Sequence, residues 1–225
     1  MVLSLLVSLL LFSIAAEPII ETSYGRIRGY STVSKDGQAI NVFKGVPYAA
    51  PPVGELRWKL PQAHSKWTQT WNATYYRPAC WGISALHIFT SGEKREMSED
   101  CIYMNIFASS KCLTSKCPIA VFFHGGDMVS GSAASFDDSR IIENFASKDI
   151  MLVIPGFRLG FAHSINFNDN HDIVPNALLA LRFLKTEGAS FGGNVDDVTL
   201  WGQSYGSTLA LALSYSPVVQ RSAVT

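Results

Sequence analysis

The residues best suited to chemistry in this sequence are those of the pentapeptide GQSYG, residues 202–206. A serine hydroxyl becomes an effective nucleophile only when a neighbouring base takes its proton. The pattern G-x-S-x-G is typical of a tight, strained turn that presents a serine between a buried strand and a helix. Strand-like residues precede this pentapeptide and a helix-like run follows it. The spacing therefore predicts a nucleophile elbow with Ser204 as nucleophile. The alternative is a plain helix cap formed by Ser204.

A glycine turn upstream is the second candidate for chemistry. The stretch FFHGGDMVSGS, residues 122–132, lies at the end of an apolar run of buried-strand length. Glycines after such a strand can direct backbone N–H groups at a substrate carbonyl oxygen and so form part of an oxyanion hole. The N–H of Tyr205 would complete this hole. The alternative is an ordinary turn at the end of a strand.

The base that Ser204 needs is not evident in the sequence. In hydrolases built on this turn the order along the chain is serine, acid, histidine. No Asp, Glu or His follows Ser204 in the 21 residues that end at Thr225. His163 and His171 follow the second predicted parallel strand and are the upstream alternatives, although we expect surface or core roles for them. We interpret His124 as a packing residue of the glycine turn.

Alternating strands and helices would position these residues. From residue 118 onward, strand-like and helix-like runs alternate three times, over 118–126, 139–149, 150–157, 174–191, 197–202 and from 204 on. This order predicts an α/β fold with a mostly parallel sheet covered by helices. A hairpin around Gly25 and further N-terminal strands would add antiparallel strands at one edge. No linker divides the chain, so we predict one domain over residues 17–225.

The N-terminal sixteen residues, MVLSLLVSLLLFSIAA, are apolar almost throughout. They predict a secretory signal peptide over residues 1–16, cut after Ala15 or Ala16, and hence a secreted, extracellular protein. The alternative is an uncleaved N-terminal anchor. We find no other run long and apolar enough to span a membrane. A composition of 48% hydrophobic and 16% charged residues with zero net charge indicates a globular protein and gives no reason to expect a nucleic-acid partner.

The chain has four cysteines, which suits an oxidising compartment. We pair Cys80 with Cys101 and Cys112 with Cys117, although the sequence alone permits two other pairings. Asn72 begins the sequon Asn-Ala-Thr in a polar, loop-like context, which predicts N-glycosylation. The sequence predicts neither a metal site nor a cofactor.

Several segments taken together resemble the type-B carboxylesterase family, which includes the cholinesterases and shares the α/β-hydrolase fold. They run in family order from about residue 18 to the end and read FKGVPYAAPPVGELRW, EMSEDCIYMNIF, VFFHGG, FRLGFAHS, FGGNVDDVTLWGQSYG and YSP. The resemblance implies a serine hydrolase that acts on carboxylic esters. It places the nucleophile at Ser204, the oxyanion donors at Gly126, Asp127 and Tyr205, and the first disulfide at Cys80 and Cys101. It also implies a buried structural ion pair between Arg57 and Glu99.

The sequence departs from the family pattern at three places that bear on function. Asp127 replaces a third glycine of the oxyanion turn, and its carboxylate would repel a developing oxyanion unless it points to solvent. Asn176 falls near an aspartate that pairs, in the family, with the arginine matching Arg158. The chain stops just after the elbow helix, whereas family members exceed 500 residues by resemblance, so the expected fold is truncated there.

Two functions remain open at this stage. The first is an esterase that hydrolyses a small carboxylic ester when a longer chain supplies the triad acid and histidine, which would leave this chain inactive alone. The second is a secreted, non-catalytic binding or adhesion protein similar to the cholinesterase-like adhesion proteins.

Overall fold

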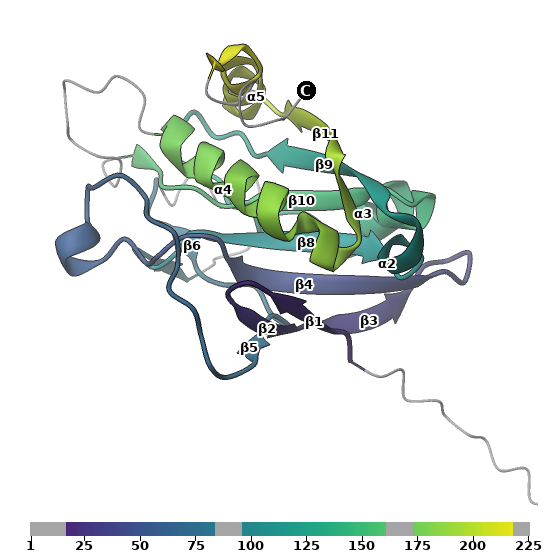
Figure 1. Cartoon of the computed structure of the whole chain (residues 1–225). Coiled ribbons are helices and arrows are strands. Elements are labelled where there is room, and N and C mark those ends of the chain that lie inside the picture. Colours follow the sequence, from purple (N-terminus) through teal and green to yellow (C-terminus); the bar gives the residue numbers. More distant parts are fainter. Residues whose placement is uncertain (1–16, 84–95, 161–172, 218–225) are drawn as a thin grey trace, which may run out of the picture.

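The computed structural model describes residues 17–83, 96–160 and 173–217 (Figure 1). Its main feature is a twisted six-stranded sheet with the order β11-β9-β10-β8-β4-β3. The strands of this sheet are β3 (Tyr30–Val33), β4 (Ala39–Pro47), β8 (Tyr103–Ser109), β9 (Cys117–Phe123), β10 (Met151–Pro155) and β11 (Gly193–Gly202). The helices are α2 (Cys112–Ser115), α3 (Asp138–Asn144), α4 (Ile173–Glu187) and α5 (Tyr205–Tyr215), with 3-10 turns at Gly54–Leu56, Ala146–Lys148 and Gly188–Phe191.

The second half of the sheet is parallel, as the alternating pattern predicts. Strand β9 lies between β10 and β11 and runs parallel to both. Helix α3 connects β9 to β10, and helix α4 connects β10 to β11. A tight hairpin reverses the direction of the chain and so joins antiparallel strands only. Parallel strands therefore need a longer crossover connection, usually a helix. The carboxyl ends of β9 and β11 therefore lie side by side, with the glycine turn after one and the serine turn after the other.

The first half of the chain adds antiparallel strands, also as predicted. Strand β8 pairs antiparallel with β10, β4 with β8, and β3 with β4. The hairpin around Gly25 joins β1 (Ile19–Thr22) to β2 (Gly25–Arg28) in a separate small sheet, which β5 (Trp71–Asn72) extends. Two further short strands, β6 (Ala79–Cys80) and β7 (Met97–Ser98), pair in parallel. Asn72 thus lies in a short edge strand and not in the loop that its sequence context indicates.

Hydrophobic cores fill both faces of the main sheet. On one face, helices α4 and α5 bury side chains that include Ala180, Leu184 and Leu209 in the larger cluster. On the opposite face, helix α3 buries Ile141 and Ile142 against Leu152 of β10 in a second cluster. The result is a three-layer arrangement of helix, sheet and helix, and both faces of β9 and β10 are covered (Figure 1).

Strand β11 differs from the buried strand predicted for residues 197–202. It is the terminal strand of the six, so within the described residues it pairs on one side only. Thr199 and Trp201 are exposed, and Val198 and Leu200 are half-buried. The apolar run predicts a buried strand, but burial of a strand depends on its neighbours, and among the described residues β11 pairs with β9 alone.

Both predicted disulfides are present. Cys80 bonds to Cys101 across 21 residues, and Cys112 bonds to Cys117 across five. The first ties β6 to the segment before β8, and the second closes the short α2 turn between β8 and β9. The predicted signal peptide, residues 1–16, lies outside the described residues. In the described part of the chain, no helix combines the length and the apolar character that crossing a membrane requires.

Candidate active site

Ser204 occupies a strained turn between β11 and α5. Its backbone has φ 54° and ψ −127°, a conformation that non-glycine residues rarely adopt. Holding a residue in such a region costs on the order of 1–3 kcal/mol, which the surrounding structure must offset. Although Ser204 immediately precedes the helix, its side chain makes no capping hydrogen bond, and the residue is exposed. The hydroxyl is therefore not used as a helix cap, which was the alternative interpretation.

The glycines on either side of the serine are required by close backbone packing. A Cβ atom on Gly206 would lie 2.1 Å from the carbonyl oxygen of Phe123. A Cβ atom on Gly202 would lie 2.4 Å from the carbonyl oxygen of Gly206. Real Cβ contacts do not approach these values, and the obstructing atoms are backbone, so no side chain can move to make room. Both outer positions of G-x-S-x-G thus accept only glycine in this packing.

The glycine turn after β9 packs directly on this elbow. A Cβ atom on Gly125 would lie 2.7 Å from the carbonyl oxygen of Gln203, and the backbone N–H of Gln203 donates to the carbonyl of Phe123 over 3.3 Å. The turn itself is closed by the carbonyl of Gly126, which accepts from the backbone N–H groups of Val129 and Ser130, both over 3.0 Å. The two segments predicted to act together are therefore in contact through their backbones.

The proposed oxyanion donors lie in these two contacting segments and have no internal acceptors. In residues 17–83, 96–160 and 173–217, the N–H groups of Gly126, Asp127 and Tyr205 donate to no protein acceptor. Buried or half-buried backbone N–H groups are nearly always paired. Three N–H groups without an acceptor among the described residues, at the carboxyl ends of adjacent strands, are the kind of donors that an oxyanion site requires.

Asp127 sits in the turn with its side chain in solvent. Its φ of 53° and that of Met128, 61°, are both left-handed, where Asp is tolerated better than most residues and glycine best of all. The side chain of Asp127 is exposed and makes no described hydrogen bond or ion pair. Asp127 thus keeps the backbone N–H that a glycine would have at this position. It differs from a glycine by carrying an exposed carboxylate side chain.

His124 has a packing role in the structure. The residue is 3% exposed, its ring stacks on Phe157 at a centroid separation of 4.2 Å, and Nδ1 lies 2.8 Å from the carbonyl oxygen of Gly125. The packing role of His124 agrees with its interpretation from the sequence. His64 lies elsewhere, against Trp67 and Trp71. The upstream alternatives for a base, His163 and His171, lie outside the described residues, as does His87.

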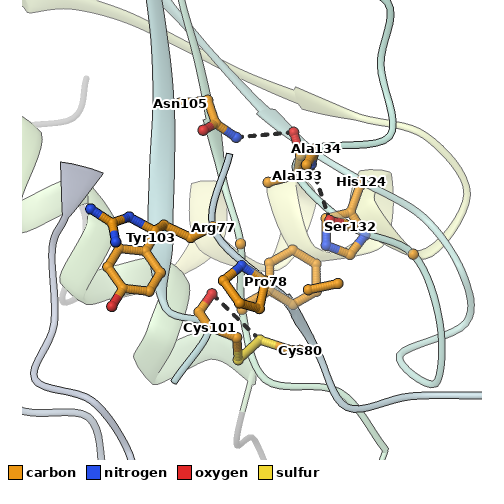
Figure 2. Close-up of a pocket in the computed structure, with 14 residues that line it drawn as sticks. Arg77, Pro78, Cys80, Cys101, Tyr103, Asn105, His124, Ser132, Ala133 and Ala134 are labelled. Carbon is orange, nitrogen blue, oxygen red and sulfur yellow. Dashed lines mark hydrogen bonds between the residues drawn. A yellow bond between two sulfur atoms is a disulfide. The ribbon is translucent and has the colours of Figure 1, made fainter. Parts of the chain in front are cut away.

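A small cavity adjoins the glycine turn (Figure 2). Its lining includes His124, Ser132 and the Cys80–Cys101 disulfide on one side, and Arg77 beside the Tyr103 ring on the other. The cavity holds about 20 Å³, enough for about one water molecule. Pockets for small-molecule ligands usually exceed about 300 Å³. This cavity is therefore part of the support of the turn and not a place for an ester substrate.

One supporting segment was not identified from the sequence. The backbone N–H of Ile83 donates to the carbonyl of Val129 over 2.7 Å, and a Cβ atom on Gly82 would lie 2.6 Å from the same oxygen. The Cys80–Cys101 disulfide fixes the start of this segment. The glycine two residues after a bridged cysteine was the available signal, because a close backbone approach excludes a side chain there.

The predicted pair of Arg57 and Glu99 forms, but it is not buried. Arg57 Nε and Nη2 donate to the two carboxylate oxygens of Glu99 over 2.5 and 2.6 Å, a bidentate geometry. The Arg57 guanidinium holds the pKa of the Glu99 carboxyl below its ordinary value. The side chains are 44% and 30% exposed, so water and salt screen the attraction.

Asn176 contacts the arginine that the family pattern pairs with an aspartate. Arg158 Nε donates to Asn176 Oδ1 over 3.3 Å, and Arg158 Nη1 donates to the carbonyl of Lys59 over 2.8 Å. Both Arg158 and Asn176 are buried. The spatial pairing is thus kept, with a hydrogen bond where the family pattern has an ion pair.

A sheet that carries a strained serine turn beside a glycine turn defines an α/β-hydrolase, and solved esterase structures that superpose on the chain have this fold. A sequence model of the carboxylesterase family matches residues 16–224. The chain belongs to the carboxylesterase family.

The proteins and solved structures reported as similar to this chain are esterases. Carboxylesterase 5A of Canis lupus familiaris is 35% identical over 216 residues, which cover 91% of this chain and 37% of that protein. Carboxylesterase 1C of Mus musculus is 32% identical over 215 residues, which cover 89% of this chain and 38% of that protein. The crystal structure of juvenile hormone esterase from Manduca sexta, with OTFP covalently attached, superposes with a TM-score of 0.82 at 31% identity. That superposition covers 92% of this chain and 39% of the other. The chain thus spans about two fifths of the proteins it matches.

Proposed function

We propose that this chain carries the nucleophile and the oxyanion site of a carboxylic ester hydrolase, with Ser204 as nucleophile. The observation that supports the proposal most strongly is the contact between the strained serine turn and the glycine turn, in which the N–H groups of Gly126, Asp127 and Tyr205 have no acceptor among the described residues. Backbone strain at a non-glycine residue such as Ser204 persists only where the surrounding structure imposes it. Residues strained in this way cluster at functional sites.

The chemistry would follow the acyl-transfer scheme of serine hydrolases. Ser204 Oγ attacks the ester carbonyl carbon while a base takes its proton, and the three N–H groups stabilise the oxyanion. The same base then returns the proton to the leaving alcohol, and water releases the acid from the acyl-enzyme. The substrate is a small carboxylic ester, and the scheme requires no cofactor or metal.

The residues that follow Ser204 do not supply the base that this scheme requires. No Asp, Glu or His follows Ser204, and His124 is engaged in packing. We therefore propose that a longer product of the gene supplies the acid and the histidine, and that the 225 residues alone do not turn over esters. We further propose that the protein is secreted after loss of residues 1–16 and is glycosylated at Asn72.

A fluorophosphonate probe tests the assignment, because it labels a serine only when a base activates it. We expect no labelling of the 225-residue chain and labelling of a longer product, if transcripts extend past Thr225. In the longer product, Ser204→Ala abolishes labelling, whereas the control Thr208→Ala, an exposed hydroxyl on the same helix, keeps it. Ester turnover by the short chain that is lost in Ser204→Ala would show that a base lies within these residues.

The second candidate is a non-catalytic binding protein, and the exposed carboxylate of Asp127 in the oxyanion turn favours it. Its repulsion of a developing negative charge would oppose catalysis. A longer product that carries an acid and a histidine, folds, and still resists the probe would decide for this candidate. Restored labelling in Asp127→Gly of that product would identify the carboxylate as the reason.

A further inference from the structure

Each of the three proposed oxyanion N–H groups shares a peptide bond with the carbonyl of the preceding residue. A trans peptide is planar, and its C=O and N–H groups point in opposite directions. The groups that hold the carbonyl therefore also set the direction of the N–H. The carbonyls concerned are those of Gly125, Gly126 and Ser204, which precede Gly126, Asp127 and Tyr205.

The carbonyl of Gly126, behind the N–H of Asp127, accepts from three donors. The backbone N–H groups of Val129 and Ser130 each donate to it over 3.0 Å. The hydroxyl of Ser130 donates to the same oxygen, also over 3.0 Å. Ser130 is 1% exposed, and a hydrogen bond in such a low-dielectric environment is electrostatically stronger than one in water. The three donors together fix the orientation of this peptide.

Two of these donors are themselves held from outside the turn. The N–H of Ser130 shares a peptide with the carbonyl of Val129, which accepts from the N–H of Ile83 over 2.7 Å. The N–H of Val129 shares a peptide with the carbonyl of Met128, which accepts from the N–H of Gly160 over 2.6 Å. Hydrogen-bonded groups in a chain polarise one another, so each bond strengthens the next. Both chains end at the carbonyl described above and polarise the N–H of its peptide.

The other two carbonyls are also held by side chains. The carbonyl of Ser204, behind the N–H of Tyr205, accepts from the N–H of Ser207 over 2.9 Å and from the Ser207 hydroxyl over 2.6 Å. The carbonyl of Gly125 lies 2.8 Å from His124 Nδ1. Because a carbonyl oxygen can only accept, Nδ1 carries the proton in this hydrogen bond. A side-chain donor thus stands behind each of the three proposed oxyanion N–H groups.

We propose that the hydroxyls of Ser130 and Ser207 are positioning groups of the oxyanion site. Each holds a peptide by its carbonyl, so that the N–H at the other end points at the carbonyl oxygen of the substrate. The same hydrogen bond polarises the peptide and makes its N–H a stronger donor. Neither hydroxyl contacts the substrate or transfers a proton. This inference rests on the proposed function, because it concerns the oxyanion donors of ester hydrolysis.

Two other serines provide matched controls. Serine hydroxyls often bond to backbone carbonyls three or four residues earlier in the chain. Ser147 and Ser115 each donate to the carbonyl four residues earlier, over 3.0 Å. Ser147 is buried, as Ser130 is, and Ser115 is exposed, as Ser207 is. Neither control bond lies behind a proposed oxyanion donor, so its loss tests the general effect of removing such a hydroxyl.

Ester turnover by the longer product measures the positioning effect. Ser130→Ala and Ser207→Ala should each lower kcat about tenfold and leave KM unchanged, because oxyanion donors act on charge that develops in the transition state. Outright loss of one donor costs about 100- to 1000-fold, and these variants misalign a donor without removing it. Ser207→Thr should restore the rate lost in Ser207→Ala, since a threonine hydroxyl in a helix can make the same bond. Ser147→Ala and Ser115→Ala should keep the wild-type rate.

Nuclear magnetic resonance of the 225-residue chain provides a readout that needs no catalysis. The carbonyl carbon resonance of Gly126 should move upfield in Ser130→Ala, and that of Ser204 should do so in Ser207→Ala, because each carbonyl loses a hydrogen bond. Thermal unfolding verifies that each variant is folded.

The outcomes separate this inference from the proposed function. A wild-type longer product that resists the fluorophosphonate probe would overturn both. If the wild type is labelled, an unchanged kcat in Ser130→Ala and Ser207→Ala would overturn the positioning role alone. Unchanged carbonyl resonances in the 225-residue chain would do the same. An equal loss of kcat in Ser147→Ala would also contradict it, because the effect would then be general to buried serines.

Discussion

At the scale of single residues, the site depends on backbone geometry more than on side chains. The hydroxyl of Ser204 is presented because the residue is held at a φ of 54°. That conformation is maintained by glycines whose missing Cβ atoms allow β9, the glycine turn and α5 to approach closely. Substitution of a buried, closely packed glycine forces the backbone apart, and overpacking of this kind is destabilising by roughly 1–3 kcal/mol.

Gly206→Ala should therefore destabilise the chain strongly, because the added methyl group would meet the carbonyl oxygen of Phe123 at 2.1 Å. We expect a loss of roughly 3 kcal/mol and a fall in Tm of roughly 10 °C, measured by thermal unfolding. The control is Gly188→Ala, whose nearest neighbour is the end of the Val195 side chain at 3.2 Å. Equal Tm values for the two variants would refute the close packing of the elbow.

At the scale of elements, the two disulfides act on segments of very different length. The Cys80–Cys101 bridge spans 21 residues and fixes the segment that contacts the glycine turn, whereas the Cys112–Cys117 bridge spans five and closes a local turn. In the chain-entropy account, a cross-link stabilises by restricting the unfolded chain, and the effect grows with the logarithm of the loop length. The longer bridge should therefore contribute more to stability.

Replacing both cysteines of the longer bridge by serine should cost about 3 kcal/mol, and the same change in the shorter bridge about 2 kcal/mol. Urea unfolding of the two double variants measures the difference. The shorter bridge serves as the internal control, because both of its cysteines are also buried. A larger loss from the five-residue bridge would show that native-state packing, and not loop closure, governs the effect.

At the scale of the whole molecule, the chain is one part of a fold that its relatives extend. It spans 37–39% of the carboxylesterases reported above and of the solved juvenile hormone esterase. The elements present form a sheet with helices on both faces, and its last strand in the described part lacks an outer neighbour. Ser204 and the three N–H groups that we propose as oxyanion donors lie within this part.

Expression in a secretory eukaryotic host tests the predicted processing of the whole chain. We expect a secreted protein that begins at Ala16 or Glu17 and carries a glycan at Asn72. Intact mass before and after treatment with a peptide-N-glycosidase measures both. Asn72→Gln should remove the glycan, and Asn144→Gln, an asparagine outside any sequon, should not. Retention of residues 1–16 in a membrane fraction would favour the uncleaved anchor instead.

Local patterns in the sequence predicted much of the fold. The periodicity of apolar residues gives the alternating strands and helices from residue 118 onward, and Gly25 marks the first hairpin. The disulfide pairing was one of three possibilities, and the structure confirms it. These features could be predicted because strand and helix formation depends on near neighbours along the chain.

The tertiary structure decided which strands and side chains are buried, because burial depends on contacts between segments that are distant in the sequence. Whether Val198–Trp201 is buried depends on which segments cover it, and the apolar run predicted a buried strand where, in the part of the chain that the structure describes, Thr199 and Trp201 are exposed. The exposure of the Arg57–Glu99 pair depends on what covers it, so its charges are screened where the family pattern led us to expect burial. The sequence by itself determined that Ser204 stands in a glycine-bounded turn. Only the tertiary structure showed what holds the strained turn that the motif predicts, namely its packing on the carbonyl of Phe123, because steric contact between distant segments exists only once the sheet has formed.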